Sequence, residues 1–421
     1  MDTGAEYLPR VVDRVLAERL TSAGAVVVEG PKASGKTSTA QQAARSAVYL
    51  DRDDAARQAI RVEPSLVLEG AAPQLVDEWQ LEGRVWNWVR SEVDRRGVPG
   101  QFILTGSSVP VDDVARHSGA GRFARLAMRP MSLYESGEST GSMSLSALLA
   151  GDRPAARASS LTVRDLVDVT VRGGWPTNRS LTIAQAARAN RDYLRTVAEI
   201  DIPRLDGTYR DPQRIMRFLQ ALARNTALEH KLARLVAEAD GDDSPALSRG
   251  AGGDYQRALQ RLMLLETQPA WSTHLRSRAR LREAPRTHFV DPSLSAAALG
   301  AGSDKWLRDL NAFGYIFESL VVRDVRVYAE PIDGTVHHYR DSDGLEVDIV
   351  IELSDGTWGA FEVKLGTDAV DAAAANLRRF AAKVDTSKVG PPAVLGVITG
   401  MGYGLTRDDG VVVVPIGALG P

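Results

Sequence analysis

The 421-residue sequence contains no cysteine. Disulfides, thiolate zinc sites, iron–sulfur clusters and cysteine nucleophiles are therefore excluded together. No apolar run approaches the roughly 18–20 residues that are needed to span a bilayer, and the first residues lack the basic and apolar regions of a signal peptide. These absences predict a soluble cytoplasmic protein that makes no contact with a membrane.

Neither sign of charge is in large excess, because 51 Lys and Arg stand against 54 Asp and Glu, for a net charge of −3. Any nucleic-acid site must therefore come from local charge rather than from the whole chain. The apolar fraction of 44% and the charged fraction of 25% are typical of a globular protein. A chain of this length is too long for one core and predicts two or three domains.

Short apolar runs separated by helical segments characterise the first third of the chain. They lie at Ala25–Gly30, Leu75–Asp77 and Phe102–Thr105. Buried strands that alternate with helices indicate an α/β domain with a parallel sheet that is covered on both faces. Around residues 135–160 the composition shifts to Ser, Gly and Ala, which marks the best candidate for a domain boundary. We therefore expect an N-terminal domain over residues 1–150.

The middle of the chain is predicted to be helical and basic. Apolar residues recur with a helical period over about residues 161–265, and after them comes the run His274–Arg282, in which arginines alternate with smaller residues. A period of two predicts a strand with one basic face, and helices followed by a basic β-ribbon are the pattern of a winged helix. Residues 151–290 hold 23 Lys and Arg against 16 Asp and Glu, a local charge of +7. We expect a helical and winged-helix-like domain over residues 160–290.

Four arginines of the basic run are the candidate nucleic-acid contacts: Arg276, Arg278, Arg280 and Arg282. Four cations on one strand face repel each other unless an anion such as the DNA backbone binds them. The alternative is a solvated face whose arginines pair with Asp and Glu elsewhere, and the sequence leaves both interpretations open.

A phosphate-binding motif follows the first apolar run. The sequence Gly-Pro-Lys-Ala-Ser-Gly-Lys-Thr at residues 30–37 matches G-x-x-x-x-G-K-[ST], directly after a strand and at the start of a helix. Its glycines allow backbone N–H groups to surround a phosphate at the helix N-terminus. Lys36 is expected to reach the β- and γ-phosphate oxygens of ATP, and the Thr37 hydroxyl to bind Mg²⁺. The nucleotide contacts are expected from Gly30, Pro31, Lys32, Ala33, Ser34, Gly35, Lys36, Thr37 and Ser38.

Polar residues at the ends of the two later strands fit the same site. Asp77 and Glu78 end one strand, at the edge where α/β sheets bind ligands. Asp77 suits the water shell of magnesium and Glu78 suits the polarisation of the attacking water, whereas the alternative is a helix cap. Ser107, after the next strand, is expected to contact the γ-phosphate or the attacking water. Arg122 is a candidate arginine finger, with surface solvation as its alternative.

These motifs resemble those of the AAA-type ATPases of bacteria and archaea that carry a C-terminal domain of unknown function. The resemblance rests on the phosphate loop and on six further runs: Asp77–Gln80, Phe102–Ser108, Met131–Glu135, Gly173–Pro176, Asp192–Leu194 and His288–Pro292. It covers nearly the whole chain. It implies an AAA-type P-loop ATPase core that uses ATP and Mg²⁺, a winged-helix segment and a nuclease-like end.

The last third of the chain resembles the PD-(D/E)xK nuclease core, and we expect a restriction-endonuclease-like α/β domain over residues 291–421. This core needs an aspartate on one strand and a Glu-x-Lys on its hairpin partner, for which Asp348, Glu362 and Lys364 are the candidates. Glu318 is the single carboxylate in an apolar helix, and a buried carboxylate needs a partner or a metal. By the resemblance, it matches the helix glutamate of that core. Glu318, Asp348 and Glu362 are expected to hold magnesium. Glu362 and Lys364 are the candidate catalytic residues, with Lys364 stabilising charge at the scissile phosphate.

The register of the hairpin decides whether Asp348 and Glu362 share a face. A two-residue Asp355-Gly356 turn pairs Asp348 with Val363. A three-residue loop, Ser354-Asp355-Gly356 with its glycine in the left-handed conformation, pairs Asp348 directly with Glu362. We predict the three-residue loop, because it brings the two Cβ atoms to roughly 5 Å from each other.

The sequence thus predicts an ATP-binding and ATP-hydrolysing protein that acts on nucleic acid, with a Mg²⁺-dependent nuclease-like domain. The alternative is a nucleotide-dependent switch or scaffold whose nuclease-like domain binds without cutting, since Glu346 opposite Lys364 also suits a plain cross-strand salt bridge. A P-loop kinase or transporter ATPase fits less well, because the chain lacks an ABC-type signature. DNA is the expected partner, and self-association of the chain stays open.

Overall fold

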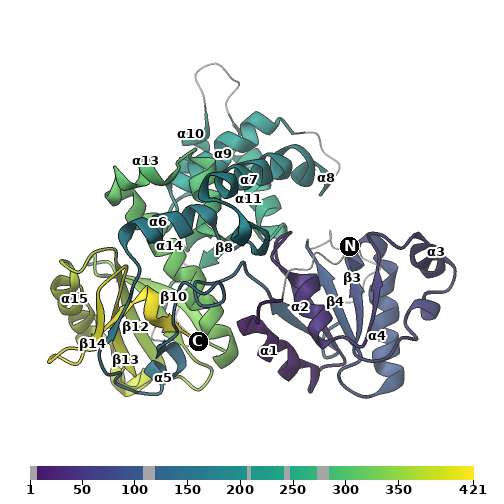
Figure 1. Cartoon of the computed structure of the whole chain (residues 1–421), viewed down its shortest axis with the longest axis horizontal. Coiled ribbons are helices and arrows are strands. Elements are labelled where there is room, and N and C mark those ends of the chain that lie inside the picture. Colours follow the sequence, from purple (N-terminus) through teal and green to yellow (C-terminus); the bar gives the residue numbers. More distant parts are fainter. Residues whose placement is uncertain (1–6, 108–118, 206–209, 241–246, 273–283) are drawn as a thin grey trace.

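The computed structural model describes residues 7–107, 119–205, 210–240, 247–272 and 284–421. Figure 1 shows that the chain forms three lobes. The N-terminal lobe, in purple and blue, contains one sheet; the helical lobe is teal; and the C-terminal lobe, in green and yellow, contains a second sheet. This mixed α/β architecture confirms the predicted fold class. None of the helices in the described ranges has the length and the apolarity that crossing a bilayer requires.

The sheet of the N-terminal lobe is parallel throughout, in the order β2-β3-β4-β1-β5. Its strands are β1 (Ala25–Glu29), β2 (Ser46–Tyr49), β3 (Gln74–Asp77), β4 (Phe102–Gly106) and β5 (Phe123–Ala127). The helices α1 (Val11–Leu20) and α2 (Lys36–Ala43) pack on one face, and α3 (Asp54–Val62) and α4 (Arg84–Arg96) pack on the other. Alternate side chains of the central strands point to opposite faces, so both faces are buried, as the apolar runs predict.

The helical lobe begins with α6 (Val163–Arg172) and α7 (Ile183–Thr196), which continues into a π-helical turn (Val197–Asp201) and α8 (Ile202–Arg204). Three further helices precede an antiparallel pair of strands, and two short helices complete the lobe. These elements are α9 (Pro212–Arg224), α10 (Leu232–Ala239), α11 (Arg249–Arg261), β8 (Leu265–Gln268), β9 (Arg286–Phe289), α12 (Pro292–Ala298) and α13 (Ser303–Leu307). Apolar side chains of α7, α9, α10, α11 and α12 form one buried core.

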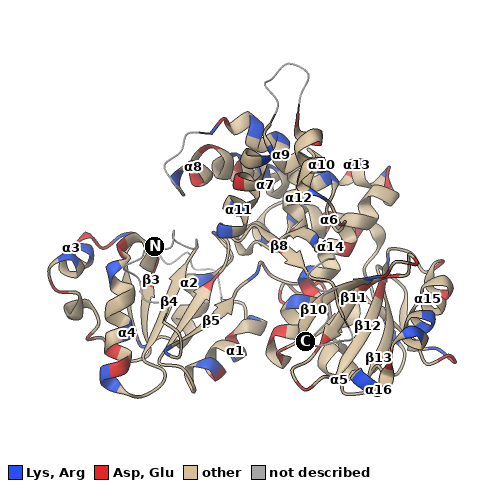
Figure 2. Ribbon diagram, turned by 180° about the vertical axis from the view of Figure 1, so that it is seen from behind, with Lys and Arg blue, Asp and Glu red and all other residues tan. Residues whose placement is uncertain are grey.

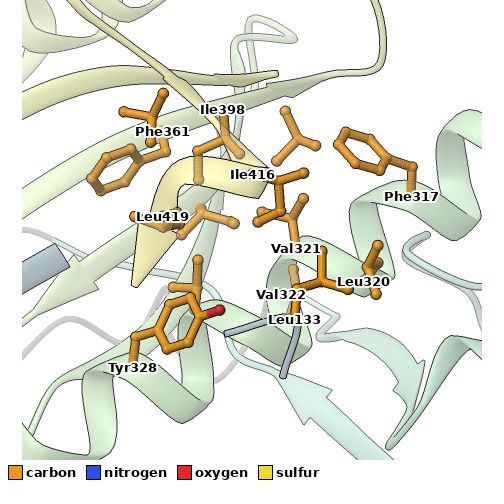
Figure 3. Packing of buried hydrophobic residues seen from close by; sticks show 14 of the residues in the cluster. Leu133, Phe317, Leu320, Val321, Val322, Tyr328, Phe361, Ile398, Ile416 and Leu419 are labelled. Atoms are coloured by element: carbon orange, nitrogen blue, oxygen red, sulfur yellow. The ribbon is translucent and has the colours of Figure 1, made fainter. Parts of the chain in front are cut away.

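The C-terminal lobe contains a seven-stranded mixed sheet in the order β10-β11-β12-β13-β15-β14-β7. Its strands are β7 (Arg157–Ala158), β10 (Thr335–Arg340), β11 (Glu346–Glu352), β12 (Trp358–Lys364), β13 (Val394–Thr399), β14 (Tyr403–Thr406) and β15 (Val412–Pro415). The long helix α14 (Leu310–Ala329) packs on one face, and α15 (Val370–Lys383), followed by α16 (Thr386–Val389), lies on the other. Figure 3 shows the core between α14 and the sheet, in which Ile416 lies between Phe361 of β12 and Phe317 of α14.

The segment around residues 135–160, which the composition marks as a boundary, is built into the C-terminal lobe. Its strand β6 (Met143–Ser144) pairs with β16 (Leu419–Gly420), and β7 pairs with β14. Between them, α5 (Leu145–Leu149) buries its leucines in the same core as α14. A few buried apolar residues anchor this segment, which is otherwise rich in Ser, Gly and Ala, to the C-terminal lobe.

A buried ion cluster, formed by Asp291, Arg323 and Asp324 and called here the buried junction, connects the lobes. The Arg323 guanidinium lies 2.8 Å from Asp291 Oδ2 and 2.7 Å from Asp324 Oδ1, and all three side chains are buried. The backbone N–H of Gly174 donates to Asp291 and that of Leu133 donates to Asp324, at 2.9 and 3.0 Å. The junction thereby ties α14 to the helical lobe and to the chain that leaves the N-terminal lobe.

Replacement of Arg323 by methionine is expected to destabilise the protein strongly, because two buried carboxylates lose their cation. Removal of one partner from a buried ion pair costs about 3–5 kcal/mol. The control is Arg164→Met, whose 3.5 Å pair with Asp304 is exposed and should contribute about 1 kcal/mol or less. A urea titration followed by circular dichroism compares the two variants. Equal midpoints would contradict the role of the junction.

Candidate functional site

The phosphate loop lies between β1 and α2, as the motif predicts, at the carboxyl end of the parallel strands. Two of its residues have left-handed backbone conformations, Ala33 with φ 63° and Gly35 with φ 99°. At Gly30 a Cβ atom would come within 2.1 Å of the Met128 carbonyl oxygen, so only glycine allows this close approach. The Ser34 hydroxyl is buried and has no hydrogen-bond partner among the described residues. A phosphate oxygen would satisfy this hydroxyl.

Lys36 points back into the loop. Its side chain is buried, and its Nζ donates a 2.7 Å hydrogen bond to the Pro31 carbonyl. Burial lowers the pKa of Lys36 to about 8, although the nearby carboxylates of Glu78 and Asp77 favour its charged form. An anion placed in the loop would favour the protonated amine further.

A hydroxyl and a carboxylate meet beside the loop. Thr37 Oγ1 donates to Asp77 Oδ1 at 2.8 Å, and the Thr105 hydroxyl on the neighbouring strand β4 donates to the same oxygen. Magnesium takes oxygen ligands and is commonly held by a hydroxyl and a carboxylate together with phosphate oxygens. The chemistry of this donor set fits the magnesium that the sequence predicts for Thr37 and Asp77.

Glu78 follows Asp77 with φ 53°, an unusual backbone conformation for a glutamate. Its carboxylate accepts hydrogen bonds from the side-chain amide of Gln80 and from Ser107, the latter at 3.4 Å. The structure therefore brings Ser107 to the site, as predicted. Gln80 is an orienting residue that the sequence analysis did not single out, since it lies in the 3-10 turn after β3 and carries no motif of its own.

The prediction that Arg122 contacts the nucleotide is wrong for the loop of its own chain. Arg122 directly precedes β5, whose first residue pairs with Ala25 at the start of β1. The phosphate loop follows the other end of β1, so the two lie at opposite edges of the sheet. The Arg122 guanidinium instead lies 2.9 Å from Asp94 and is partly exposed. Within its own chain, Arg122 therefore has the surface position that the alternative describes.

Arg10 contacts the loop, although no sequence motif marks it. Its guanidinium donates to the Ser34 carbonyl at 3.0 Å and to the Arg129 carbonyl at 2.8 Å, and its Nε lies 3.0 Å from Glu135. Both charged side chains are buried. The backbone of the phosphate loop is thus fixed to the segment that leads out of the N-terminal lobe.

The helical lobe also reaches the phosphate loop. Lys32 Nζ lies 2.6 Å from Asp201 Oδ1 in the π-helical turn, and the Tyr193 hydroxyl of α7 donates to the Lys32 carbonyl at 3.3 Å. The Asp201 side chain is 7% exposed and that of Lys32 is 49% exposed. One residue of the loop therefore faces both the phosphate site and a second lobe. Neither Asp201 nor Tyr193 is predictable as a partner, because each is more than 150 residues away in sequence.

The β11–β12 hairpin has the predicted three-residue loop. Ile349 pairs with Phe361 and Glu352 with Trp358, the Leu353 N–H donates to the Thr357 carbonyl, and Gly356 has φ 88°. Continued by one residue, this register places Asp348 opposite Glu362. Figure 2 shows acidic residues at the end of these strands nearest the helical lobe.

The carboxylates of this end form a cluster with cations. Lys364 Nζ lies 2.6 Å from Glu362 Oε2 and 3.5 Å from Asp348 Oδ2, and Asn376 donates to Glu362 Oε1 at 2.8 Å. Burial raises the pKa of Glu362, as does the Asp348 carboxylate. Burial and Asp348 likewise raise the pKa of Glu318, against the influence of Arg286 and Lys364. Arg286 and Lys364 therefore favour the ionised forms of these carboxylates.

Arg286 of β9 inserts into this cluster, which the sequence analysis missed. Its Nη1 lies 2.7 Å from Glu318 and 3.4 Å from Asp348, and its Nη2 lies 3.1 Å from Glu346. Its side chain is 6% exposed. The described ion pairs of Glu346 are with Arg286 and with Arg340, at 3.2 Å, so the predicted cross-strand pair with Lys364 is not the one that forms.

The carboxylates of the cluster do not fit a metal in this arrangement. Within the described residues, no three His, Asp or Glu side chains form a group that could hold a metal ion. Glu318, Asp348 and Glu362 lie in one region, but a guanidinium occupies the space between the first two and an ammonium bonds the third. The expectation that these three residues hold magnesium stays a prediction, and a metal there would have to replace these cations.

The predicted nucleic-acid residues Arg276, Arg278, Arg280 and Arg282 lie outside the described residues. The described neighbours on either side belong to the helical lobe: β8 precedes this stretch and β9 follows it. The assignment of these arginines to DNA stays a prediction.

Three family models match parts of the chain. Residues 22–137 match an AAA domain, residues 163–305 match a domain of unknown function (DUF8612), and residues 313–419 match a second domain of unknown function (DUF4143). These ranges agree with the three lobes. Comparison with curated proteins found no match.

Solved structures that the chain resembles include one Walker-type ATPase and two proteins bound to DNA. The Walker-type ATPase PABY2304 of Pyrococcus abyssi is 13% identical to this chain, with a TM-score of 0.40. The match covers 68% of this chain and 94% of the PABY2304 chain. The ORC1 protein of Aeropyrum pernix in complex with DNA is 12% identical with a TM-score of 0.31, covering 73% and 96%. Drosophila ORC bound to DNA is 12% identical with a TM-score of 0.21, covering 66% and 90%.

The strand order of the N-terminal lobe, the phosphate loop after β1 and the family match over residues 22–137 agree with each other. The chain carries an AAA-type P-loop ATPase domain.

Proposed function

We propose that the protein is an ATP-dependent switch that acts on nucleic acid. In this proposal its C-terminal lobe binds DNA or protein without cleaving it. The observation that carries the proposal is the 2.6 Å ion pair between Lys32 of the phosphate loop and Asp201 of the helical lobe. The nucleotide site and the predicted nucleic-acid-binding lobe meet at this pair.

Four side chains, from the phosphate loop, the start of α2 and the end of β3, would support ATP hydrolysis. Lys36 is placed to bind the phosphate oxygens, and Thr37 with Asp77 supplies the hydroxyl and carboxylate that would hold magnesium. Bound magnesium would neutralise charge on the phosphates during transfer. Glu78, whose carboxylate Gln80 and Ser107 orient, is the residue that would polarise the attacking water.

Nucleotide binding would act on the helical lobe through the Lys32–Asp201 ion pair. A triphosphate in the loop adds several negative charges beside Lys32 and competes with Asp201 for its ammonium group. Asp201 is almost buried, so weakening its ion pair leaves a poorly solvated carboxylate and changes the free energy of the contact. A ligand shifts a conformational equilibrium only through such a difference in interaction energy between two states.

The helical lobe is the proposed contact for nucleic acid. The helices α9, α10 and α11 followed by the antiparallel strands β8 and β9 have the order of a winged helix. The sequence between the two strands carries the four alternating arginines, in a region with a local charge of +7. Phosphate contacts by arginine would account for this excess of cations.

Two variants test the ATPase assignment. Lys36→Ala is expected to abolish ATP binding, because the loop loses its buried cation. Glu78→Gln is expected to bind ATP normally and to lower kcat by about 10²–10⁴-fold, the usual contribution of a general base. Calorimetry measures binding and a phosphate-release assay measures turnover. Arg122→Ala is the control and should behave as wild type, because Arg122 lies at the opposite edge of the sheet. Normal turnover in Lys36→Ala would overturn the assignment.

Alanine substitutions in the arginine run test the nucleic-acid proposal. Removing one arginine–phosphate interaction should reduce the log–log slope of DNA affinity against salt concentration by about one unit. Fluorescence anisotropy of a labelled duplex, measured over a series of salt concentrations, gives the slope for the double variant Arg278→Ala, Arg280→Ala. The double variant Arg90→Ala, Arg95→Ala on α4 of the N-terminal lobe is the control for removal of two positive charges. Identical slopes for the two double variants would contradict the assignment.

A further inference from the structure

The cluster at the end of β11 and β12 contains a cation from outside its own sheet. Arg286 belongs to β9 of the helical lobe, whereas Glu318, Asp348 and Glu346 belong to α14 and β11 of the C-terminal lobe. Arg286 lies within 3.4 Å of all three carboxylates. The cluster is therefore a contact between two lobes.

The carboxylate oxygens of Asp348 and Glu362 already have partners. Asp348 Oδ2 accepts from the Val363 N–H at 2.9 Å, and its Oδ1 faces Arg286. The two oxygens of Glu362 accept from Lys364 and Asn376. A divalent cation would have to displace a guanidinium from carboxylates in a poorly solvated site, and the repulsion between two cations there is large.

The backbone around β8 holds Arg286 in place. Gln268 donates its side-chain amide to the carbonyls of Asp348 and His337, each at 2.9 Å. After β8 the chain pairs with β10, since the Trp271 N–H donates to the His338 carbonyl at 2.7 Å and the His338 N–H donates to the Pro269 carbonyl at 3.0 Å. β9 is bound to β8 along its whole length. The backbone position of Arg286 is therefore fixed at this edge between the two lobes, and its ion pairs with Glu318, Glu346 and Asp348 hold its guanidinium in the cluster.

We propose that Arg286 takes the place of a metal ion in the C-terminal lobe, and that the carboxylate cluster is the docking site of the paired strands β8 and β9 rather than a metal centre. The carboxylates keep their positions because the guanidinium neutralises them. The cluster holds the predicted winged-helix element against the C-terminal sheet. This inference rests on the part of the proposed function in which the C-terminal lobe does not cut nucleic acid. It does not depend on ATP hydrolysis by the N-terminal lobe.

Manganese binding to the nucleotide-free full-length protein tests the proposal, with the free Mn²⁺ signal in electron paramagnetic resonance as the readout. Wild type is expected to bind no Mn²⁺ that depends on Glu362. Arg286→Gln is expected to gain one such ion, about tenfold or more tighter than any binding by wild type, which corresponds to at least about 1.4 kcal/mol. Adding Glu362→Gln to that variant should remove the ion again.

Two results would overturn the proposal. One is stoichiometric Mn²⁺ binding by wild type that Glu362→Gln abolishes, and this comparison does not require Arg286→Gln to fold. The other is a folded Arg286→Gln protein that binds no Mn²⁺, which would show that the guanidinium is not what excludes the metal. Because the assay contains no nucleotide, its outcome is separate from that of the ATPase experiments.

Discussion

The arrangement of the three lobes depends on one buried guanidinium, that of Arg323. Arg323 lies between Asp291 of the helical lobe and Asp324 of its own helix, out of contact with water. A buried charge is tolerated only when its partners and hydrogen bonds are complete. The Gly174 and Leu133 N–H groups donate to the two carboxylates, so the turn after α6 and the chain leaving the N-terminal lobe are fixed at the same point. Three runs that are separate motifs in the sequence therefore meet at the buried junction. They are Met131–Glu135, Gly173–Pro176 and His288–Pro292.

A continuous set of contacts leads from this junction to the phosphate loop. Leu133 is two residues from Glu135, whose carboxylate holds Arg10, and Arg10 donates to the Ser34 carbonyl of the loop. A second set of contacts passes through Lys32 and Asp201. The backbone of the phosphate loop is thus bound by residues that also position the other lobes. These contacts are the basis of the proposal that nucleotide binding acts on the other lobes.

The sequence predicts local features of the site well and long-range partners poorly. The phosphate loop and the three-residue hairpin loop follow from motif, turn chemistry and the period of two in strands, all of which act over a few residues. Arg286 carries no motif, and its partners lie 32–62 residues away, so only the folded chain reveals that it occupies the carboxylate cluster. Arg122 shows the same limit of local patterns: it is a candidate arginine finger from its sequence, but the parallel sheet places it at the edge opposite the phosphate loop of its own chain.

Hydrogen exchange of the π-helical turn and α8 (residues 197–204), with and without ATP and magnesium, tests the central claim most directly. If the phosphate loop communicates through Lys32 and Asp201, ATP should increase exchange in this segment of the wild-type protein. The increase should be absent in Lys36→Ala, which cannot bind the nucleotide, and in Asp201→Asn, which has no ion pair to weaken. Unchanged exchange in a wild-type protein shown by calorimetry to be saturated with ATP would contradict the account.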